Sequence, residues 1–198
     1  MIKCIASDMD GTLLTGNANI SEKNIQAIKQ AQENGVEFVV ATGRSFQEAQ
    51  FALVQAGISC PVICVNGAEV RSADGEIVAS QPLPQELAVQ AAEILAYHDV
   101  YFEVYTDKGA FTNDIDQAIS VMLDVFTSAN HQFSEEEVEA FAKERVDSGF
   151  VHFLEDYHEI FASNQIYKLL AFSPDLAELS NARERLSQLT ELAVSSSR

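Results

Sequence analysis

Short apolar runs alternate with amphipathic stretches along the first part of the chain. The apolar runs at 2–8, 36–41 and 61–65 are typical of buried strands, and the stretches at 21–34 and 45–56 have helical spacing between them. An alternation of strand and helix with short connections predicts a parallel sheet whose crossovers are right-handed. The sequence therefore predicts an α/β architecture for this region.

Local signals support these boundaries. Ser21 is placed to cap the first helix, and Ser45 with Glu48 forms the Ser-x-x-Glu capping box of the second. Residues 68–71 and 76–79 flank a turn-forming Ser-Ala-Asp-Gly segment, which predicts a hairpin after the third strand.

The pattern changes after the segment 80–84, whose two prolines indicate a linker. Beyond it, helices and strands alternate less regularly, which predicts a second α+β unit with its own small sheet. The expected elements are a helix at 86–97, a half-buried alternating strand at 100–106 followed by a turn and a short strand, helices at 115–129 and 134–146 (the latter opened by a second capping box, Ser134-x-x-Glu137), a strand at 165–172, a helix at 174–188 and a last strand at 192–196.

Composition narrows the function. The chain has 198 residues, a hydrophobic content of 47%, ample for a core, and a formal net charge of −18. That charge argues against nucleic acid or an anionic membrane as partner, since both require a basic surface. No signal peptide and no membrane-spanning run are recognisable, so we expect a cytoplasmic protein.

Cys60 and Cys64 are expected to be buried thiols. Cys60 and Cys64 would lie about 13 Å apart on a strand, too far for a disulfide. The histidines do not supply the spacing of a zinc site.

Candidate chemistry begins with Asp8 and Asp10, which follow the first predicted strand. Two residues apart on an extended chain, they would project to the same side, roughly 7 Å apart. Two carboxylates about 4 Å apart repel by roughly 4 kcal/mol at an effective dielectric of 20, so such a pair requires a proton or a cation, and oxygen ligands favour Mg²⁺. An acidic loop, a calcium site or the Asp-x-Asp of a glycosyltransferase are the alternatives. The calcium pattern fails because its loop needs glycine where Leu13 stands.

Two further polar clusters follow the next two strands: Thr42-Gly43-Arg44 and Asn66-Gly67. Carboxyl ends of parallel strands meet at one edge of a sheet, where open α/β sheets bind their ligands. There, Asp8 could act as a nucleophile and Asp10 as an acid or base, while Mg²⁺ and Thr42 stabilise a transferring phosphoryl group.

These motifs resemble those of a known family. Asp8-Met9-Asp10-Gly11-Thr12-Leu13-Leu14 resembles the first motif of the haloacid dehalogenase-like (HAD) superfamily, while Ala41-Thr42-Gly43-Arg44 and Asn66-Gly67-Ala68 are similar to its Cof-like sugar-phosphatase subfamily. The resemblance implies a Rossmann-like parallel core with an inserted α+β cap. It divides the chain into core residues 1–82, cap residues 83–194 and a return to the core at 195–198.

The resemblance also implies roles. Asp8 would be the phosphorylated nucleophile and a Mg²⁺ ligand, and Asp10 the general acid and base, with its backbone carbonyl on the metal. The substrate would be a small phosphorylated metabolite such as a sugar phosphate. The residues expected to bind its phosphate or line its site are Thr42, Gly43, Arg44 and Asn66.

The chain departs from the family in one respect. Members carry, after the cap, a lysine that pairs with the nucleophile and phosphate, and a Gly-Asp-x-x-Asn-Asp motif that completes the Mg²⁺ site. Neither is found here, and Lys168 lies inside a predicted cap strand. The alternative functions are therefore a catalytically impaired fragment or binding module, and a mutase that shares the aspartyl-phosphate step.

The same departure has a structural consequence. Without strands on the far side of 2–8, an apolar strand would form an open sheet edge. We expect a second copy or another chain to cover it, or the 198 residues to be part of a longer protein.

Overall fold

The computed structural model describes residues 2–15, 18–121 and 135–195. The chain divides into two compact units, Met1–Gln81 and Pro82–Arg198, here called the N-terminal and C-terminal units. The division falls within the proline-containing segment that the sequence indicates as a linker.

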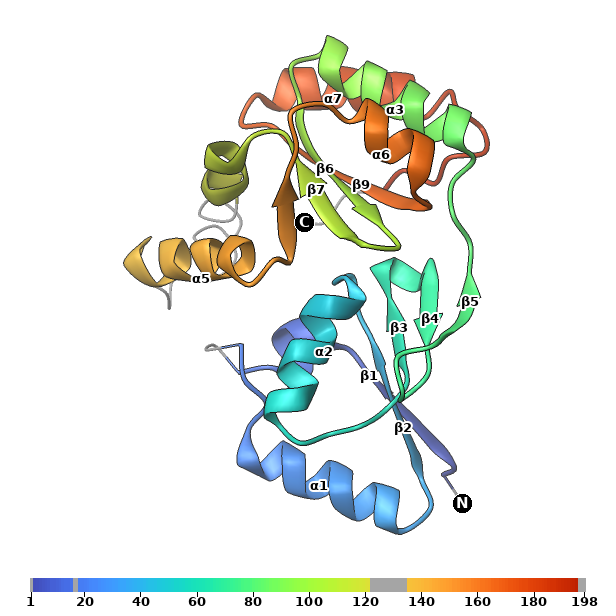
Figure 1. Ribbon diagram of the computed structural model, residues 1–198, viewed down its shortest axis with the longest axis vertical. Coiled ribbons are helices and arrows are strands. Elements are labelled where there is room, and N and C mark those ends of the chain that lie inside the picture. Colours follow the sequence, from blue (N-terminus) through green and yellow to red (C-terminus); the bar gives the residue numbers. More distant parts are fainter. Residues whose placement is uncertain (1, 16–17, 122–134, 196–198) are drawn as a thin grey trace. The chain divides into compact units, whose positions relative to one another are not determined.

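The N-terminal unit is built on one five-stranded sheet in the order β1-β2-β3-β4-β5 (Figure 1). Strands β1, β2 and β3 are parallel, and β3, β4 and β5 pair antiparallel. The predicted parallel sheet and the hairpin that follows it are both confirmed. The elements are β1 (Cys4–Ser7), α1 (Glu22–Glu33), β2 (Glu37–Ala41), α2 (Phe46–Gln55), β3 (Val62–Cys64), β4 (Glu69–Arg71) and β5 (Ile77–Ser80).

Both helix starts form as their capping residues predict. The Ser21 hydroxyl accepts a hydrogen bond from the Asn24 N–H at 3.3 Å. At α2 the capping box is complete: Glu48 N–H donates to Ser45 Oγ at 3.3 Å, and Ser45 N–H donates to Glu48 Oε2 at 3.1 Å. These bonds satisfy backbone donors that a helix start leaves without partners.

The sheet of this unit has one well-buried face. The strands follow one another in spatial order, so right-handed crossovers place α1 and α2 on the same face. Side chains on that face are buried, as at Phe38, Val40 and Val62. Side chains between them, such as Val39 and Ile63, are only half-buried.

The prediction that the first strand is buried was wrong. β1 lies at the edge of the sheet, with residues 4–6 exposed. Ile2 is 70% exposed and Ile5 39%. An apolar run specifies a strand, but burial depends on a neighbouring strand, and β1 has a neighbour on one side only. The expected open edge is therefore present in the described structure.

We expect this edge to mediate association between copies of the chain. The unpaired N–H and C=O groups of an edge strand form a template for pairing with another strand, and a lysine there opposes it. Substituting Ile5→Lys should raise the dissociation constant of self-association by ~10-fold or more. Light scattering after size-exclusion chromatography over a concentration series measures this.

The matched control is Val78→Lys in β5, the opposite edge of the same sheet, where the side chain is 66% exposed. It should leave association unchanged. A chain that stays monomeric at high concentration, or one whose association is lost with the Val78 variant and kept with the Ile5 variant, would contradict the assignment to β1.

The C-terminal unit has a four-stranded sheet in the order β8-β7-β6-β9. Strands β6, β7 and β9 pair antiparallel, whereas β7 and β8 are parallel. The elements are α3 (Gln85–Tyr97), β6 (Tyr101–Thr106), β7 (Gly109–Thr112), α5 (Glu135–Asp147), β8 (Val151–Phe153), α6 (His158–Ser163), β9 (Ile166–Phe172) and α7 (Leu176–Leu186).

The core of this unit lies between the sheet and three helices, α3, α6 and α7, which share one side of it (Figure 1). Leu95 from α3, Phe161 from α6 and Leu186 from α7 pack with Phe102 and Val104 of β6. Helix α5 contacts the edge strand β8. The predicted separate α+β arrangement is therefore observed.

Several predictions for this unit need correction. Strand β6 is buried at every position rather than at alternate ones. Residues 192–195 are not a strand, and residue 196 of the predicted last strand lies outside the described residues. Strand β8 and helix α6 were not predicted. Of the helix expected at 115–129, residues 115–121 are helical and the rest lie outside the described residues, as does Ser134 of the second predicted capping box.

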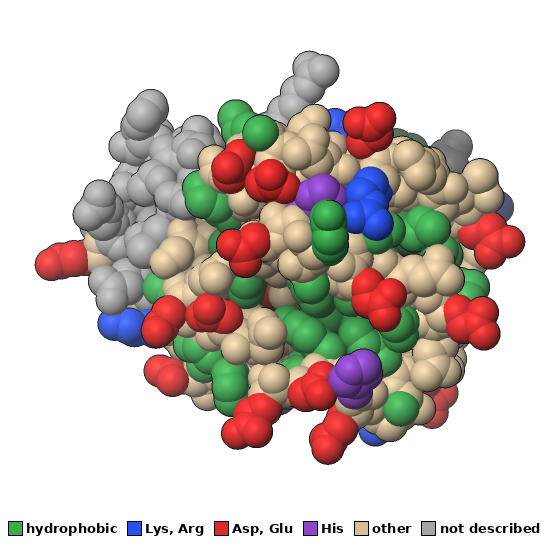
Figure 2. Space-filling model, turned by 90° about the horizontal axis from the view of Figure 1, so that it is seen from above, with side chains coloured by type: hydrophobic (Ala, Val, Ile, Leu, Met, Phe, Trp, Pro, Cys, Tyr) green, Lys and Arg blue, Asp and Glu red, His purple; other side chains and the backbone are tan. Residues whose placement is uncertain are grey.

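The surface reflects the composition. Figure 2 shows acidic side chains spread over one face of the molecule, with few basic ones among them. Within the described residues, no helix combines the length and apolarity needed to cross a membrane.

Candidate functional site

The first polar cluster lies in a wide turn after β1. The strand ends at Ser7, Asp8 is extended (φ −70°, ψ 159°), and Met9–Leu13 form a π-helical turn broken at Asp10 and Gly11. Gly11 has φ +71°, a left-handed conformation that glycine adopts without strain. Met9, which is fully buried, anchors the turn and leaves both carboxylates exposed.

One detail of the sequence prediction therefore changes. Asp8 is extended, but Asp10 is carried by the turn, so the two residues do not lie on one extended strand. The predicted position of the cluster at the carboxyl end of β1 is nevertheless what the structure shows.

The second cluster joins the first through an ion pair. Arg44 donates from Nε to Asp10 Oδ2 at 2.9 Å and from Nη2 to Asp10 Oδ1 at 2.7 Å. The Arg44 side chain is 18% exposed and that of Asp10 57%. A two-bond guanidinium–carboxylate contact of this kind fixes direction as well as distance.

The loop after β2 is held firmly in place. Thr42 N–H donates to the Ile63 carbonyl at 2.8 Å, which ties the loop to β3. Arg44 N–H donates to Thr42 Oγ1 at 3.2 Å, and Ser45 begins α2 immediately afterwards. Thr42 is buried, so its hydroxyl is presented by a fixed backbone.

The third cluster closes onto this loop. After β3, Val65 N–H donates to the Arg44 carbonyl at 2.9 Å, and Asn66 N–H donates to the Thr42 carbonyl at 3.2 Å. All three clusters therefore lie together at the carboxyl ends of β1, β2 and β3.

The turn at Val65 and Asn66 is strained. Both residues are left-handed, with φ of +49° and +57°. This conformation is rare for a β-branched residue and costs on the order of 1–3 kcal/mol. The two hydrogen bonds to the Thr42–Arg44 loop and the burial of Val65 offset that cost. Asn66-Gly67 signals a turn in the sequence, but nothing there signals strain at Val65.

Position 43 requires glycine because the Asn66 side chain lies close to its backbone. A Cβ added at Gly43 would lie 2.5 Å from Asn66 Oδ1, so any larger residue would displace the Asn66 amide. The sequence places Gly43 and Asn66 in separate clusters, and the structure makes them neighbours.

The buried cysteines of this unit are unsuited to nucleophilic chemistry. Burial raises the pKa of the Cys60 thiol to about 11. For Cys64, burial is again the main cause, and the Glu69 carboxylate adds to it; together they raise the pKa to about 12. Thiols with such pKa values stay protonated near neutral pH. Both cysteines are free, as expected.

The described residues supply only part of the ligand set that a metal ion needs. Among them, no group of three His, Cys, Asp or Glu side chains could hold a metal ion. The turn carries the carboxylates of Asp8 and Asp10, and that of Asp10 is paired with Arg44. Mg²⁺ commonly binds through one or two carboxylates and keeps several waters, so this donor set fits part of a magnesium site.

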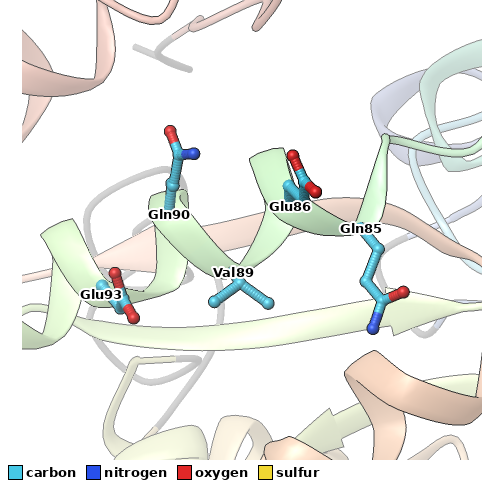
Figure 3. Close-up of a pocket in the computed structure, with 5 residues that line it drawn as sticks. All are labelled: Gln85, Glu86, Val89, Gln90 and Glu93. Atoms are coloured by element: carbon cyan, nitrogen blue, oxygen red, sulfur yellow. The ribbon is translucent and has the colours of Figure 1, made fainter.

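A surface hollow of about 470 Å³ lies elsewhere, in the C-terminal unit. Figure 3 shows that its lining comes from α3 alone, and it includes none of the predicted site residues. Its lining residues are Gln85, Glu86, Val89, Gln90 and Glu93.

Comparison with known proteins identifies relatives along the whole chain. The family model described as haloacid dehalogenase-like hydrolase matches residues 5–198. A Bacillus subtilis (strain 168) protein, 5-amino-6-(5-phospho-D-ribitylamino)uracil phosphatase YwtE, is 31% identical over 99% of this chain and 68% of its own length. Phosphatase YwpJ of the same organism is 28% identical over 99% of this chain and 70% of its own.

Solved structures agree with the sequence comparison. A haloacid dehalogenase-like hydrolase from B. subtilis superposes with a TM-score of 0.88 at 28% identity, covering 98% of this chain and 70% of that one. The resemblance inferred from the three motifs is thus confirmed.

Proposed function

We propose that this chain, which belongs to the haloacid dehalogenase-like hydrolase family and has named phosphatases among its relatives, removes phosphate from small phosphorylated metabolites. The observation that carries the proposal is the convergence of Asp8, Asp10, Thr42, Arg44 and Asn66 at the carboxyl ends of three neighbouring strands.

Asp8 is the proposed nucleophile. Its exposed carboxylate attacks phosphorus, a P–O bond forms on Asp8, and the ester P–O bond breaks. The electron pair of the broken bond goes to the leaving oxygen, which takes a proton from the Asp10 carboxyl group. Water then attacks the phosphorus of the aspartyl-phosphate, and Asp10 takes the proton of that water. Phosphate leaves and Asp8 is regenerated.

Thr42 and Asn66 are proposed to bind the transferring group. The Thr42 Oγ1 accepts from Arg44 N–H, which leaves its own O–H to donate to a phosphoryl oxygen. The Asn66 side chain lies against Gly43, so its amide is placed beside the same loop.

Mg²⁺ is the proposed cofactor. Asp8 would contribute its carboxylate and Asp10 its backbone carbonyl. When bound, the ion would neutralise charge on the phosphoryl group. In a chain with a net charge of −18, local cations of this kind are needed to attract an anionic substrate.

Metal dependence tests the proposal. Release of phosphate from an aryl phosphate should fall to the uncatalysed rate in EDTA and return when Mg²⁺ is added in excess. A rate that does not respond to EDTA would contradict the proposed cofactor. The measurement is a colorimetric phosphate assay on the full 198-residue chain.

A second candidate is a binding module without turnover. It is favoured by the lack of a three-ligand cluster among the described residues and by the position of Lys168, whose Nζ lies over the Tyr105 ring in the C-terminal unit. Calorimetry separates the two functions, because heat of Mg²⁺ binding without phosphate release supports the binding module alone.

A further inference from the structure

The guanidinium group of Arg44 binds the Asp10 carboxylate through one of its edges. Nε and Nη2 donate to the two carboxylate oxygens at 2.9 and 2.7 Å. The sequence assigned Arg44 to the substrate. The structure instead directs these two donors at the residue proposed as general acid and base.

The backbone of Arg44 is fixed on both sides. Its N–H donates to Thr42 Oγ1, and its carbonyl accepts from Val65 N–H. Its side chain is mostly buried, whereas that of Asp10 is 57% exposed. An exposed aspartate samples several rotamers. The carboxylate of Asp10 is therefore oriented by a group that is itself held in place.

We infer that Arg44 is a positioning residue, which fixes the Asp10 carboxylate for proton transfer, rather than a group whose main contact is the substrate. The inference rests on the proposed function, because that function gives Asp10 its role. A bidentate fork suits this task, since it sets both the direction and the plane of the carboxylate. Lysine, a point charge, would restore the attraction without the orientation.

A misplaced acid affects substrates unequally. An alkyl leaving group, such as a sugar hydroxyl, departs poorly without a proton, so its rate depends on Asp10. A p-nitrophenolate leaving group is stable as an anion and needs little help. Because Asp10 also serves the later hydrolysis of the aspartyl-phosphate, which is the same for every substrate, the difference is expected in kcat/KM, which reports the first step. Loss of positioning should lower kcat/KM far more for alkyl phosphates than for aryl phosphates, whereas loss of a phosphate contact would lower both alike.

The first experiment observes the contact without requiring activity. In ¹H–¹⁵N spectra of the full chain, the Nε–Hε signal of Arg44, assigned with Arg44→Lys, should be protected from exchange and should lose that protection in Asp10→Ala. Arg71 is the internal control, because its Nε–Hε donates to Glu69 at 2.9 Å and should be unaffected. An Arg44 signal that is unchanged in Asp10→Ala would overturn the inference.

The second experiment measures the consequence. Arg44→Gln and Arg44→Lys should each lower kcat/KM for a sugar phosphate by ~10²-fold and for p-nitrophenyl phosphate by ~10-fold or less. Equal losses of kcat/KM for both substrates, or a rise in KM with kcat unchanged, would overturn it in favour of a substrate contact. A parent chain without turnover would contradict the proposed function, and the spectra would still decide whether Arg44 holds Asp10.

Discussion

Replacing Asp8 with asparagine is expected to lower kcat for aryl phosphate hydrolysis by ~10³-fold or more. The amide keeps the size of the carboxylate but removes the anionic oxygen that attacks phosphorus. Asp8 is exposed at the end of β1, and the turn is anchored by the buried Met9 rather than by Asp8. The fold should therefore survive the change. Initial rates at saturating substrate and Mg²⁺ measure the effect.

The matched control is Asp74→Asn, the same change at an exposed position of the β4–β5 turn. It should retain the rate of the parent chain. Thermal unfolding curves establish that both variants are folded. Equal rates for Asp8→Asn and the parent would remove Asp8 as the nucleophile.

The second large effect is expected in the C-terminal unit, on stability rather than catalysis. Glu103 of β6 is only 3% exposed, and Arg145 of α5 lies 3.6 Å from it. The hydroxyl of Tyr105 donates to Glu103 at 3.1 Å and accepts from Arg145 at 3.4 Å. Substituting Arg145→Met removes a cation and leaves Glu103 buried, so we expect a loss of about 3–5 kcal/mol in the free energy of unfolding.

A double-mutant cycle tests this account of the pair. Glu103→Gln removes the buried charge, so adding it to Arg145→Met should recover part of the lost stability. Arg183→Met on α7, where the arginine is exposed, should change stability by less than about 0.5 kcal/mol. Equal effects of the Arg145 and Arg183 substitutions in urea unfolding would show that the buried pair contributes nothing.

Tyr101 belongs to the same buried polar cluster as Glu103. Its hydroxyl lies 2.9 Å from Thr112 Oγ1 and 3.4 Å from Glu103 Oε1. Burial, with the charge of Glu103 as a smaller contribution, raises the pKa of the Tyr101 hydroxyl well above its usual value. The side of β6 that carries Glu103 is thus a buried polar network in which each group depends on its neighbours.

Elements with local signals could be predicted from the sequence. The cap at Ser21 and the capping box of Ser45 and Glu48 act within one helical turn, so the residues that specify them are adjacent in the chain. The sequence also predicts that the carboxyl ends of β1, β2 and β3 lie side by side, because consecutive parallel strands joined by short crossovers allow few topologies.

Features that depend on distant residues could not be predicted. The alternating pattern at 100–106 predicted a half-buried strand, whereas Glu103 is buried beside Arg145, which lies on another element. Exposure of β1 depends on what lies beside it, not on its own residues. Strand β8 and helix α6 are too short for a periodic signal.

Within the site, the sequence supplied the residues but not their contacts. The Arg44–Asp10 pair joins two loops, and arginine after Thr-Gly is equally compatible with a substrate contact. The strained backbone at Val65 depends on hydrogen bonds to the Thr42–Arg44 loop, which become apparent only when the strands are assembled.

The most direct test of the central claim is to trap the phosphorylated residue. The chain is quenched during turnover and treated with borohydride, which reduces an acyl phosphate and converts the aspartate that carried it to homoserine. Peptide mass spectrometry then locates the change. We predict modification at position 8 in the parent chain and none in Asp8→Asn. Turnover without modification at that position, or with modification of another aspartate, would contradict the account.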